Sequence, residues 1–224
     1  MAQSQDIHLI SPASITQWAQ DILKASDASP GRRYLMGIAG IPGSGKSTFA
    51  SQMLEAINRL RPGVARLIPM DGFHLPDSKL EQMGLRSRKG SPDTFDAQGY
   101  VSLLQKAQFV DSVLHFSIYD RKQHAAVMID DPMTRLDADV RIVLTEGNYL
   151  LLNHLPWITL RHVLDQCWFL HIDPEKAQRW LIGRHVQGGR SEAEAHTRYD
   201  HNDGPNTWYI LTRSRTPDRI ISWP

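Results

Sequence analysis

Eight consecutive residues, from Gly40 to Ser47, carry the strongest chemical signal in the sequence. They read Gly-Ile-Pro-Gly-Ser-Gly-Lys-Ser and match the pattern G-x-x-x-x-G-K-[ST] at every fixed position. Glycines let backbone N–H groups converge on phosphate oxygens, and the N-terminus of a following helix adds partial positive charge. The residues predicted to bind the phosphates of a nucleoside triphosphate are Gly40, Ile41, Pro42, Gly43, Ser44, Gly45, Lys46, Ser47 and Thr48.

Within this loop, Lys46 is expected to reach the outer phosphates and the Ser47 hydroxyl to bind Mg²⁺. Two apolar segments of the sequence end on acids, at Asp71 and at Glu146. In an open parallel sheet, ligands bind at the carboxyl ends of the strands. Glu146 is therefore predicted to hold the hydrated Mg²⁺, and Asp71 to accept a proton from a substrate hydroxyl. The alternative for either acid is a turn or helix-capping role.

The elements that must position these residues follow from the hydrophobic pattern. Short apolar segments bounded by turn residues predict strands, and a period of about 3.6 residues predicts helices. Strands are expected at 34–40, 65–71, 112–120, 125–130, 140–152, 167–173 and 218–223. Helices are expected at 12–26, 46–60, 97–109, 156–165, 174–186 and 207–215.

Strands that alternate with helices predict an α/β fold. We expect a P-loop NTPase with three α/β/α layers, a mostly parallel central sheet and a small mobile lid. The 224 residues suit one domain over 1–224, with a helix within 1–30 packed on its core. Polar, glycine-containing stretches predict a long functional loop at 72–95 and the lid at about 186–204.

The composition narrows the partners and the compartment. The formal net charge of +1 predicts neither a nucleic acid nor a membrane as partner. The single cysteine, Cys167, rules out a disulfide within the chain, and no segment reaches the roughly 20 apolar residues of a membrane span. We expect a cytoplasmic protein with Mg²⁺ as its only metal, because no cluster has the spacing of a zinc site.

Several further motifs occur in a specific order. They are GIAGIPGSGKST, MDGFHL, RKGSPDTFD, IYDR, VLTEGNYLLL, and RHVQGG followed by NDGPN, and they run from Gly37 to Asn206, within a match that extends from about 33 to 222. In this order and spacing the chain resembles the phosphoribulokinase/uridine kinase family of P-loop kinases, with type I pantothenate kinase as a relative. Within the family it is most similar to a bacterial branch labelled sugar-transport-associated or nucleoside-kinase-like.

The resemblance implies roles for single residues. Asp71 matches the catalytic acid of the family, and Glu146 matches its Mg²⁺-side carboxylate. Arg184 matches a lid arginine over the triphosphate, which makes Asp71, Lys46 and Arg184 the predicted catalytic set. Arg88 and Lys89 lie where the substrate-side loop is found; their alternative is a solvated loop.

Three further residues of the quoted motifs complete the predicted site. Tyr119 and Asp120 match the tyrosine–aspartate pair that borders the acceptor site, although Tyr119 could instead be core. His74 could form a hydrogen bond with a substrate hydroxyl or be a structural histidine. Whether His74 or Arg190 takes part stays open. For Asn202, Asp203 and Asn206, the favoured interpretation is a structural one, in which they cap the following helix.

The chain departs from its relatives at two points. Ser117 stands where the family often has proline, and the RKG segment at 88–90 is absent from uridine kinases and closer to pantothenate kinase. The acceptor therefore stays open among a sugar such as fructose, a nucleoside such as uridine and a pantothenate-like alcohol.

These observations predict an ATP-dependent small-molecule kinase that transfers the γ-phosphoryl group of Mg-ATP to an alcohol. ATP is favoured over GTP because the sequence has no N-K-x-D base-reading motif. One alternative is a regulatory nucleotide switch without small-molecule kinase activity. A second is a nucleic-acid-linked ATPase, which the low net charge disfavours. The sequence does not decide between a monomer and a homodimer.

Overall fold

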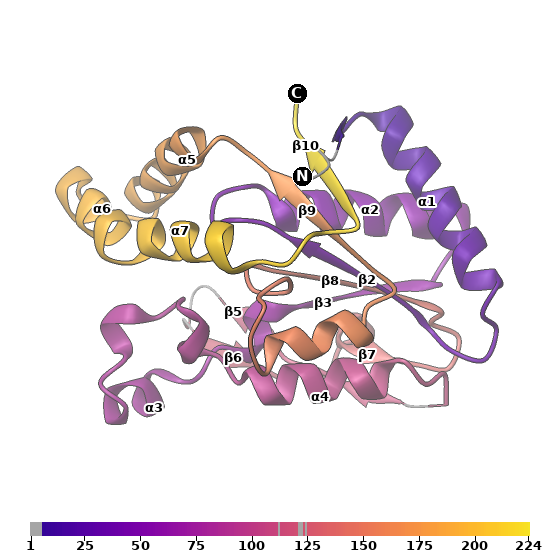
Figure 1. Ribbon diagram of the computed structural model, residues 1–224. Helices are drawn as coiled ribbons and strands as arrows, with labels where there is room; N and C mark the ends of the chain where they lie inside the picture. Colours follow the sequence, from indigo (N-terminus) through magenta and orange to yellow (C-terminus); the bar gives the residue numbers. More distant parts are fainter. Residues whose placement is uncertain (1–5, 112, 121–122, 124) are drawn as a thin grey trace.

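A computed structural model describes residues 6–111, 113–120, 123 and 125–224 (Figure 1). Six strands form one sheet in the order β1-β10-β9-β2-β8-β3, and each neighbouring pair is parallel. These strands are β1 (Ile7–Leu9), β2 (Tyr34–Ala39), β3 (Ala65–Pro69), β8 (Ile142–Gly147), β9 (Gln166–His171) and β10 (Arg219–Ser222). The predicted α/β fold with a mostly parallel central sheet is confirmed.

Helices cover both faces of this sheet. The α-helices of the described residues are α1 (Pro12–Asp27), α2 (Lys46–Leu60), α3 (Asp77–Gln82), α4 (Ala97–Ala107), α5 (Pro174–Gln187), α6 (Glu192–Arg198) and α7 (Gly204–Arg213). In Figure 1, α1 and α2 lie on one side of the sheet and α4 lies on the other. No helix of the described residues is long and apolar enough to cross a membrane.

Strand β2 explains why the sheet needs two covering layers. All six of its residues are buried, and their side chains alternate between two hydrophobic clusters. Leu35 belongs to the cluster beneath α4, whereas Met36 and Ile38 belong to the cluster beneath α1 and α2. Side chains of a strand point alternately to opposite faces, so a strand that is apolar throughout must be covered on both.

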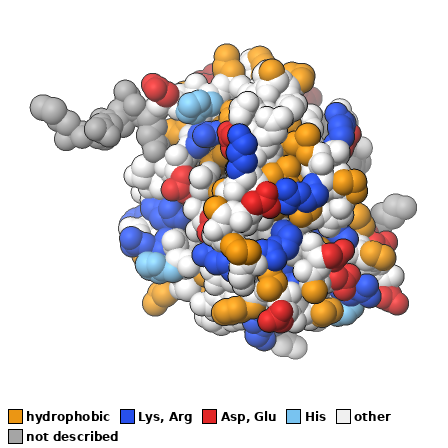
Figure 2. All heavy atoms as spheres, turned by 90° about the vertical axis from the view of Figure 1, so that its right-hand side faces the viewer, with side chains coloured by type: hydrophobic (Ala, Val, Ile, Leu, Met, Phe, Trp, Pro, Cys, Tyr) orange, Lys and Arg blue, Asp and Glu red, His pale blue; other side chains and the backbone are white. Residues whose placement is uncertain are grey.

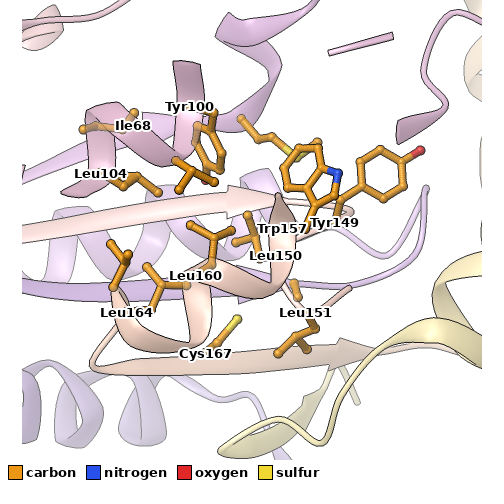
Figure 3. Close-up of a cluster of buried hydrophobic side chains, with 14 of the residues drawn as sticks. Ile68, Tyr100, Leu104, Tyr149, Leu150, Leu151, Trp157, Leu160, Leu164 and Cys167 are labelled. Atoms are coloured by element: carbon orange, nitrogen blue, oxygen red, sulfur yellow. The ribbon is translucent and has the colours of Figure 1, made fainter. Parts of the chain in front are cut away.

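The cluster on the α4 side also reaches the functional end of the sheet (Figure 3). It brings together Tyr100 of α4, Tyr149 after β8, and Trp157 of a short 3₁₀ segment, Trp157–His162. The Tyr149 and Trp157 rings lie 5.5 Å apart. Residues 156–165 were expected to form a helix, and the structure has this tighter 3₁₀ segment instead.

A buried arginine ties three remote parts of the chain together. Arg33 directly precedes β2 and is 0% exposed. Its guanidinium donates to at least five backbone carbonyls, which belong to Ala107, Phe109, Val110, Asp137 and Val140. Burial lowers the pKa of Arg33, although nearby aspartates oppose that effect.

The strands predicted at 112–120 and 125–130 do not join the central sheet. They contribute β5 (Ile118–Asp120) and β6 (Ala125–Val127), which pair with each other in antiparallel fashion, and β4 (Leu114–His115), which pairs with β7 (Arg135–Leu136). Residue 112 lies outside the described residues. The paired residues of β5 and β6 are only half-buried, as expected for strands that lack a layer on each face.

Both predicted loops contain helices. Residues 72–95 include α3, and the lid region includes α6 followed by a π-helical turn, Tyr199–Asp203. Helix α6 starts with a capping box between Ser191 and Glu194, but Ala195 is its only buried residue, so its apolar pattern is weak. On the face shown in Figure 2, basic and acidic side chains are interspersed, in keeping with the low net charge.

Candidate active site

The phosphate loop connects β2 to α2 at the carboxyl end of the sheet. Gly45 adopts a φ of 88°, in the left-handed region that favours glycine. Among the described residues, no side chain forms a capping hydrogen bond at the start of α2. The backbone N–H groups of its first turn are therefore available to an anion. The Trp223 indole N–H donates to the Ser44 carbonyl at 3.1 Å and supports the loop from the last strand.

Lys46 and Ser47 lie at the start of α2 beside the end of β8. The Ser47 hydroxyl donates to the Glu146 carboxylate at 2.8 Å, and Glu146 is buried. The Lys46 ammonium is also buried and donates to the Ile41 carbonyl at 3.0 Å. Burial lowers the pKa of Lys46, while the carboxylates of Glu146 and Asp71 oppose that shift. An incoming phosphate would supply further negative charge beside this ammonium.

The oxygens of Ser47 and Glu146 fit a magnesium ion. Mg²⁺ prefers oxygen ligands and usually keeps several waters, with one or two protein groups and substrate phosphates completing its shell. Among the described residues, no group of three or more His, Cys, Asp or Glu side chains forms an all-protein metal cage. A hydroxyl and a carboxylate beside a phosphate-binding loop instead match the mode in which protein groups and nucleotide phosphates bind Mg²⁺ together.

A cavity of about 710 Å³ opens next to the phosphate loop. It brings together ten of the residues predicted for the site: Pro42, Gly43, Lys46, Ser47, Asp71, His74, Lys89, Tyr119, Glu146 and Arg184. Gly40, Ile41, Ser44, Gly45 and Thr48 were also predicted to bind the phosphates but do not line this cavity. Segments far apart in the sequence thus meet around one space.

Asp71 does not end a strand as expected, because β3 stops at Pro69 and Asp71 lies in a 3₁₀ turn, Met70–Phe73. The Asp71 side chain is 46% exposed. The next residue, Gly72, fixes where this turn lies. A Cβ at Gly72 would come within 2.0 Å of the Ser117 carbonyl, so only glycine lets the turn pack against the segment that leads into β5.

His74 lies between two aromatic rings in the same cavity. Its ring centroid is 4.1 Å from that of Phe95 and 4.7 Å from that of Tyr119. His74 Nδ1 lies 2.9 Å from the Asp71 carbonyl oxygen, and this contact requires Nδ1 to carry the proton. Burial lowers the pKa of His74, so the neutral ring presents Nε2 as a hydrogen-bond acceptor.

The segment around Arg88 and Lys89, within the predicted loop at 72–95, is called the substrate loop below. Lys89 is its most enclosed basic side chain. Its ammonium forms an ion pair with Asp77 and lies 5.6 Å from the centroid of the Tyr119 ring. The hydrogen bond from Lys89 holds the pKa of Asp77 below its usual range. Arg86 also contacts Asp77, at 3.5 Å, and pairs with Glu81 at 2.9 Å.

The structure does not bring Arg88 and Asp120 to this cavity. Arg88 pairs with Asp93 at 3.3 Å and lines a second cavity of about 630 Å³. Asp120 accepts hydrogen bonds from the backbone and side chain of Gln123. Arg88 lies in a 3₁₀ turn, Arg86–Arg88, which directs neighbouring side chains differently. Lys89 and Tyr119 line the cavity whereas Arg88 and Asp120 do not, so a role for Arg88 and Asp120 in binding the acceptor stays a prediction.

The lid region contacts the substrate loop through residues that the sequence analysis did not place in the site. Arg198 Nη2 and Asn202 Nδ2 donate to the Lys89 carbonyl at 2.6 and 3.0 Å. Among the described residues, no side chain forms a capping hydrogen bond at the start of α7, so the predicted capping role of Asn202, Asp203 and Asn206 is wrong. A signal did exist, because the capping box sets the register of α6 and puts Arg198 three residues after the buried Ala195.

Two further lid contacts lie nearer the phosphate loop. His185 Nε2 lies 2.8 Å from an Asp203 carboxylate oxygen, and Arg190 Nη1 lies 3.3 Å from His185 Nδ1. Arg184 precedes His185 on α5 and lines the same cavity. The positive charge of Arg184 contributes to the lowered pKa of Lys46. Lys46, Arg184 and Arg190 therefore line the cavity beside the phosphate loop.

Comparisons with known proteins find one family model and several similar chains. A family model described as "Methylmalonyl Co-A mutase-associated GTPase MeaB" matches residues 7–70, the part that contains the phosphate loop. The chain is 34% identical over 201 residues to the "Putative uridine kinase C227.14" of Schizosaccharomyces pombe, across 85% of this chain and 83% of that protein. It is 33% identical over 196 residues to the "Uncharacterized protein YggC" of Escherichia coli K12, across 86% and 79%.

A solved structure has a similar fold over nearly the whole chain. The "putative fructose transport system kinase" from Silicibacter sp. TM1040 is 29% identical and superposes with a TM-score of 0.83, over 94% of this chain and 98% of that one. The fold and the phosphate loop define a nucleotide-binding protein of the P-loop class. The chain belongs to the phosphoribulokinase/uridine kinase family of P-loop kinases.

Proposed function

We propose that the protein is an ATP-dependent kinase that transfers the γ-phosphoryl group of Mg-ATP to a hydroxyl of a small metabolite. One observation carries the proposal: a single cavity joins the phosphate loop at Lys46 and Ser47 to Asp71 and to the substrate loop at Lys89. A kinase needs a donor half-site and an acceptor half-site that open into the same space. Relatives whose names are those of kinases support the same reading.

The donor half holds the triphosphate. The backbone N–H groups of the loop and the N-terminus of α2 would bind phosphate oxygens, and Lys46 would neutralise the outer phosphates. Ser47 and Glu146 would hold Mg²⁺, which offsets charge on the outer phosphates when it is bound. Arg184 lines the cavity from α5 and would stabilise charge that develops during transfer.

The acceptor half orients the alcohol. Asp71 would accept the proton of the attacking hydroxyl, and the neutral His74 would accept a hydrogen bond from a hydroxyl group through Nε2. The lid would exclude water, which limits wasteful hydrolysis of the nucleotide. Catalysis then depends mainly on positioning and electrostatics.

The direct test is a kinase screen of the full chain with Mg-ATP. The panel contains sugars, nucleosides and hydroxy acids, and mass spectrometry detects the gain of one phosphate. ATP turnover that only a macromolecule stimulates, with no phosphorylated metabolite, would favour the alternative of a regulatory switch. That alternative requires a partner surface but no acceptor half-site.

Two variants assign the roles. Lys46→Ala should abolish tight ATP binding and turnover, because it removes the ammonium beside the outer phosphates. Asp71→Asn should keep ATP binding but reduce turnover at least about 100-fold, since the amide cannot accept the proton. Asp21→Asn, an exposed position on α1, serves as the matched control. Equal turnover in Asp71→Asn and Asp21→Asn would remove Asp71 from the mechanism.

A further inference from the structure

Hydrogen bonds hold the backbone of the substrate loop in a fixed position at Lys89. The Lys89 carbonyl accepts hydrogen bonds from both Arg198 and Asn202 of the lid region. The carbonyl of the next residue, Gly90, accepts a hydrogen bond from the buried Tyr149 hydroxyl. Backbone contacts on two consecutive residues therefore hold this part of the loop in place.

The Lys89 side chain is held as well. It is 15% exposed, lies over the Tyr119 ring, and pairs with Asp77, whose side chain is 37% exposed. A surface lysine must lose much rotamer freedom before it can bind a ligand. Lys89 has already lost that freedom, so its ammonium is preorganised for an anion that enters the cavity.

The charges near Lys89 leave room for such an anion. Within the cavity, Lys89 and Arg86 share one carboxylate, that of Asp77. Arg86 also pairs with Glu81, but both side chains are more than half exposed, so solvent weakens that pair. Three other carboxylates line the cavity: Asp71, where the proposed transfer takes place, Glu146, which accepts a hydrogen bond from Ser47, and Asp203, which lies 2.8 Å from His185 Nε2.

We propose that the phosphate acceptor is an alcohol that carries an anionic group, a carboxylate or a phosphate, and that Lys89 binds this group with Arg86 beside it. This inference rests on the proposed kinase function and makes its acceptor specific. The hydroxyl would lie toward Asp71 and His74, and the anion toward Lys89. A neutral sugar or nucleoside would bring no negative charge to the preorganised ammonium, which already pairs with Asp77.

Acceptors in charge-matched pairs test the proposal with the full chain and Mg-ATP. The pairs are glycerate and glycerol, pantothenate and pantothenyl alcohol, ribose 5-phosphate and ribose, and fructose 6-phosphate and fructose. We expect phosphorylation of anionic members with kcat/KM at least roughly tenfold above that of their neutral partners. The first two pairs report on a carboxylate and the last two on a phosphate.

Variants of the lysine tie this preference to its position. Lys89→Met should lower kcat/KM for the anionic acceptor by roughly 10- to 100-fold, mainly through KM, while the Kd for ATP stays unchanged. Lys89→Arg keeps the charge and should retain the preference for anions. The control is Lys79→Met on α3, an exposed position outside the cavity.

The outcomes distinguish failure of the anionic-acceptor proposal from failure of the proposed kinase function. Preferred phosphorylation of neutral members, or an unchanged charge preference in Lys89→Met, would overturn the anionic acceptor and leave the kinase function standing. Intact ATP binding with no alcohol of either set phosphorylated would overturn the proposed kinase function itself.

Discussion

At the scale of single residues, His74 shows how burial sets a charge state. Its ring lies between Phe95 and Tyr119, and burial lowers its pKa from the ordinary value of 6.5. The carboxylates of Asp71 and Asp77 oppose this shift, whereas the ammonium of Lys89 adds to it. The ring therefore stays neutral at pH values where an exposed histidine begins to take up a proton.

This shift predicts a pH-dependent stability. Between the lowered folded-state pKa and 6.5, the unfolded chain binds more protons at His74 than the folded chain does. The contribution of His74 to the free energy of unfolding is thus full above 6.5 and falls as the pH decreases through that interval. Urea unfolding at about pH 7.5 and about pH 5.5 should show a smaller acid loss in His74→Asn than in the wild type.

Asparagine suits this test because its amide nitrogen can replace Nδ1 in the hydrogen bond to the Asp71 carbonyl. The control is His162→Asn, an exposed histidine at the end of the segment Trp157–His162, which should keep the acid loss of the wild type. Identical pH dependence in His74→Asn and the wild type would contradict the burial of a neutral ring.

Single residues were predictable from the sequence where their function depends on local spacing. The loop from Gly40 to Ser47 is such a case, since strand, turn and helix follow one another directly. Asp77 and Arg198 were not predicted, because their contacts reach 12 and 109 residues along the chain to Lys89. The spacing of residues within α6 indicates that Arg198 shares a face with the buried Ala195, but it does not identify Lys89 as the partner.

At the scale of elements, the central relation is that between the lid region and the substrate loop. Arg198 of α6 and Asn202 of the following π-helical turn donate to the same carbonyl, that of Lys89. Helix α5, which precedes them, carries Arg184 beside the phosphate loop. Consecutive elements of one segment thus connect the proposed donor and acceptor half-sites.

We expect Arg198→Ala to loosen the substrate loop. The variant loses hydrogen bonds from a charged group to the carbonyls of Ser87 and Lys89, each of which contributes roughly 1.5–3 kcal/mol. Amide hydrogen exchange at Ser91 and Thr94 should therefore accelerate about tenfold or more. The KM for an acceptor should rise, while the Kd for ATP should change little.

An exposed arginine on the neighbouring helix provides the comparison. Arg179→Ala on α5 removes the same side chain outside the cavity and should leave exchange at Ser91 and Thr94 unchanged. Equal exchange rates in the two variants would show that the lid contacts do not order the substrate loop.

Elements were predictable where the hydrophobic period is strong. The bounds of α2 match the predicted 46–60, and β2 differs from its prediction by one residue. Strand β1 was missed because its three residues are all exposed at the edge of the sheet. Helix α6 was missed because it buries a single residue, so polar composition alone suggested a loop.

At the scale of the whole molecule, the order of strands decides which side chains meet. Strand β2 lies between β8 and β9, so the phosphate loop emerges next to Glu146 at the end of β8. The last strand, β10, runs beside β9 and carries Trp223 to the back of the phosphate loop. The sequence predicted a parallel sheet but not this order, because pairing of strands distant in the sequence depends on packing of the whole chain.

At the scale of the whole molecule, we predict that replacement of Arg33 lowers the stability of the fold. Replacement by methionine keeps most of the buried volume but leaves the carbonyls at Ala107–Val110 and Asp137–Val140 without their donor. Because buried polar groups without partners are costly, Arg33→Met should lower the free energy of unfolding by about 3 kcal/mol or more. Its neighbour Arg32 forms a surface ion pair with Asp165, so Arg32→Met should cost only about 0–1 kcal/mol. Urea unfolding of the two variants compares these values directly. Equal losses would show that the buried Arg33 guanidinium adds no more stability than the surface ion pair of Arg32.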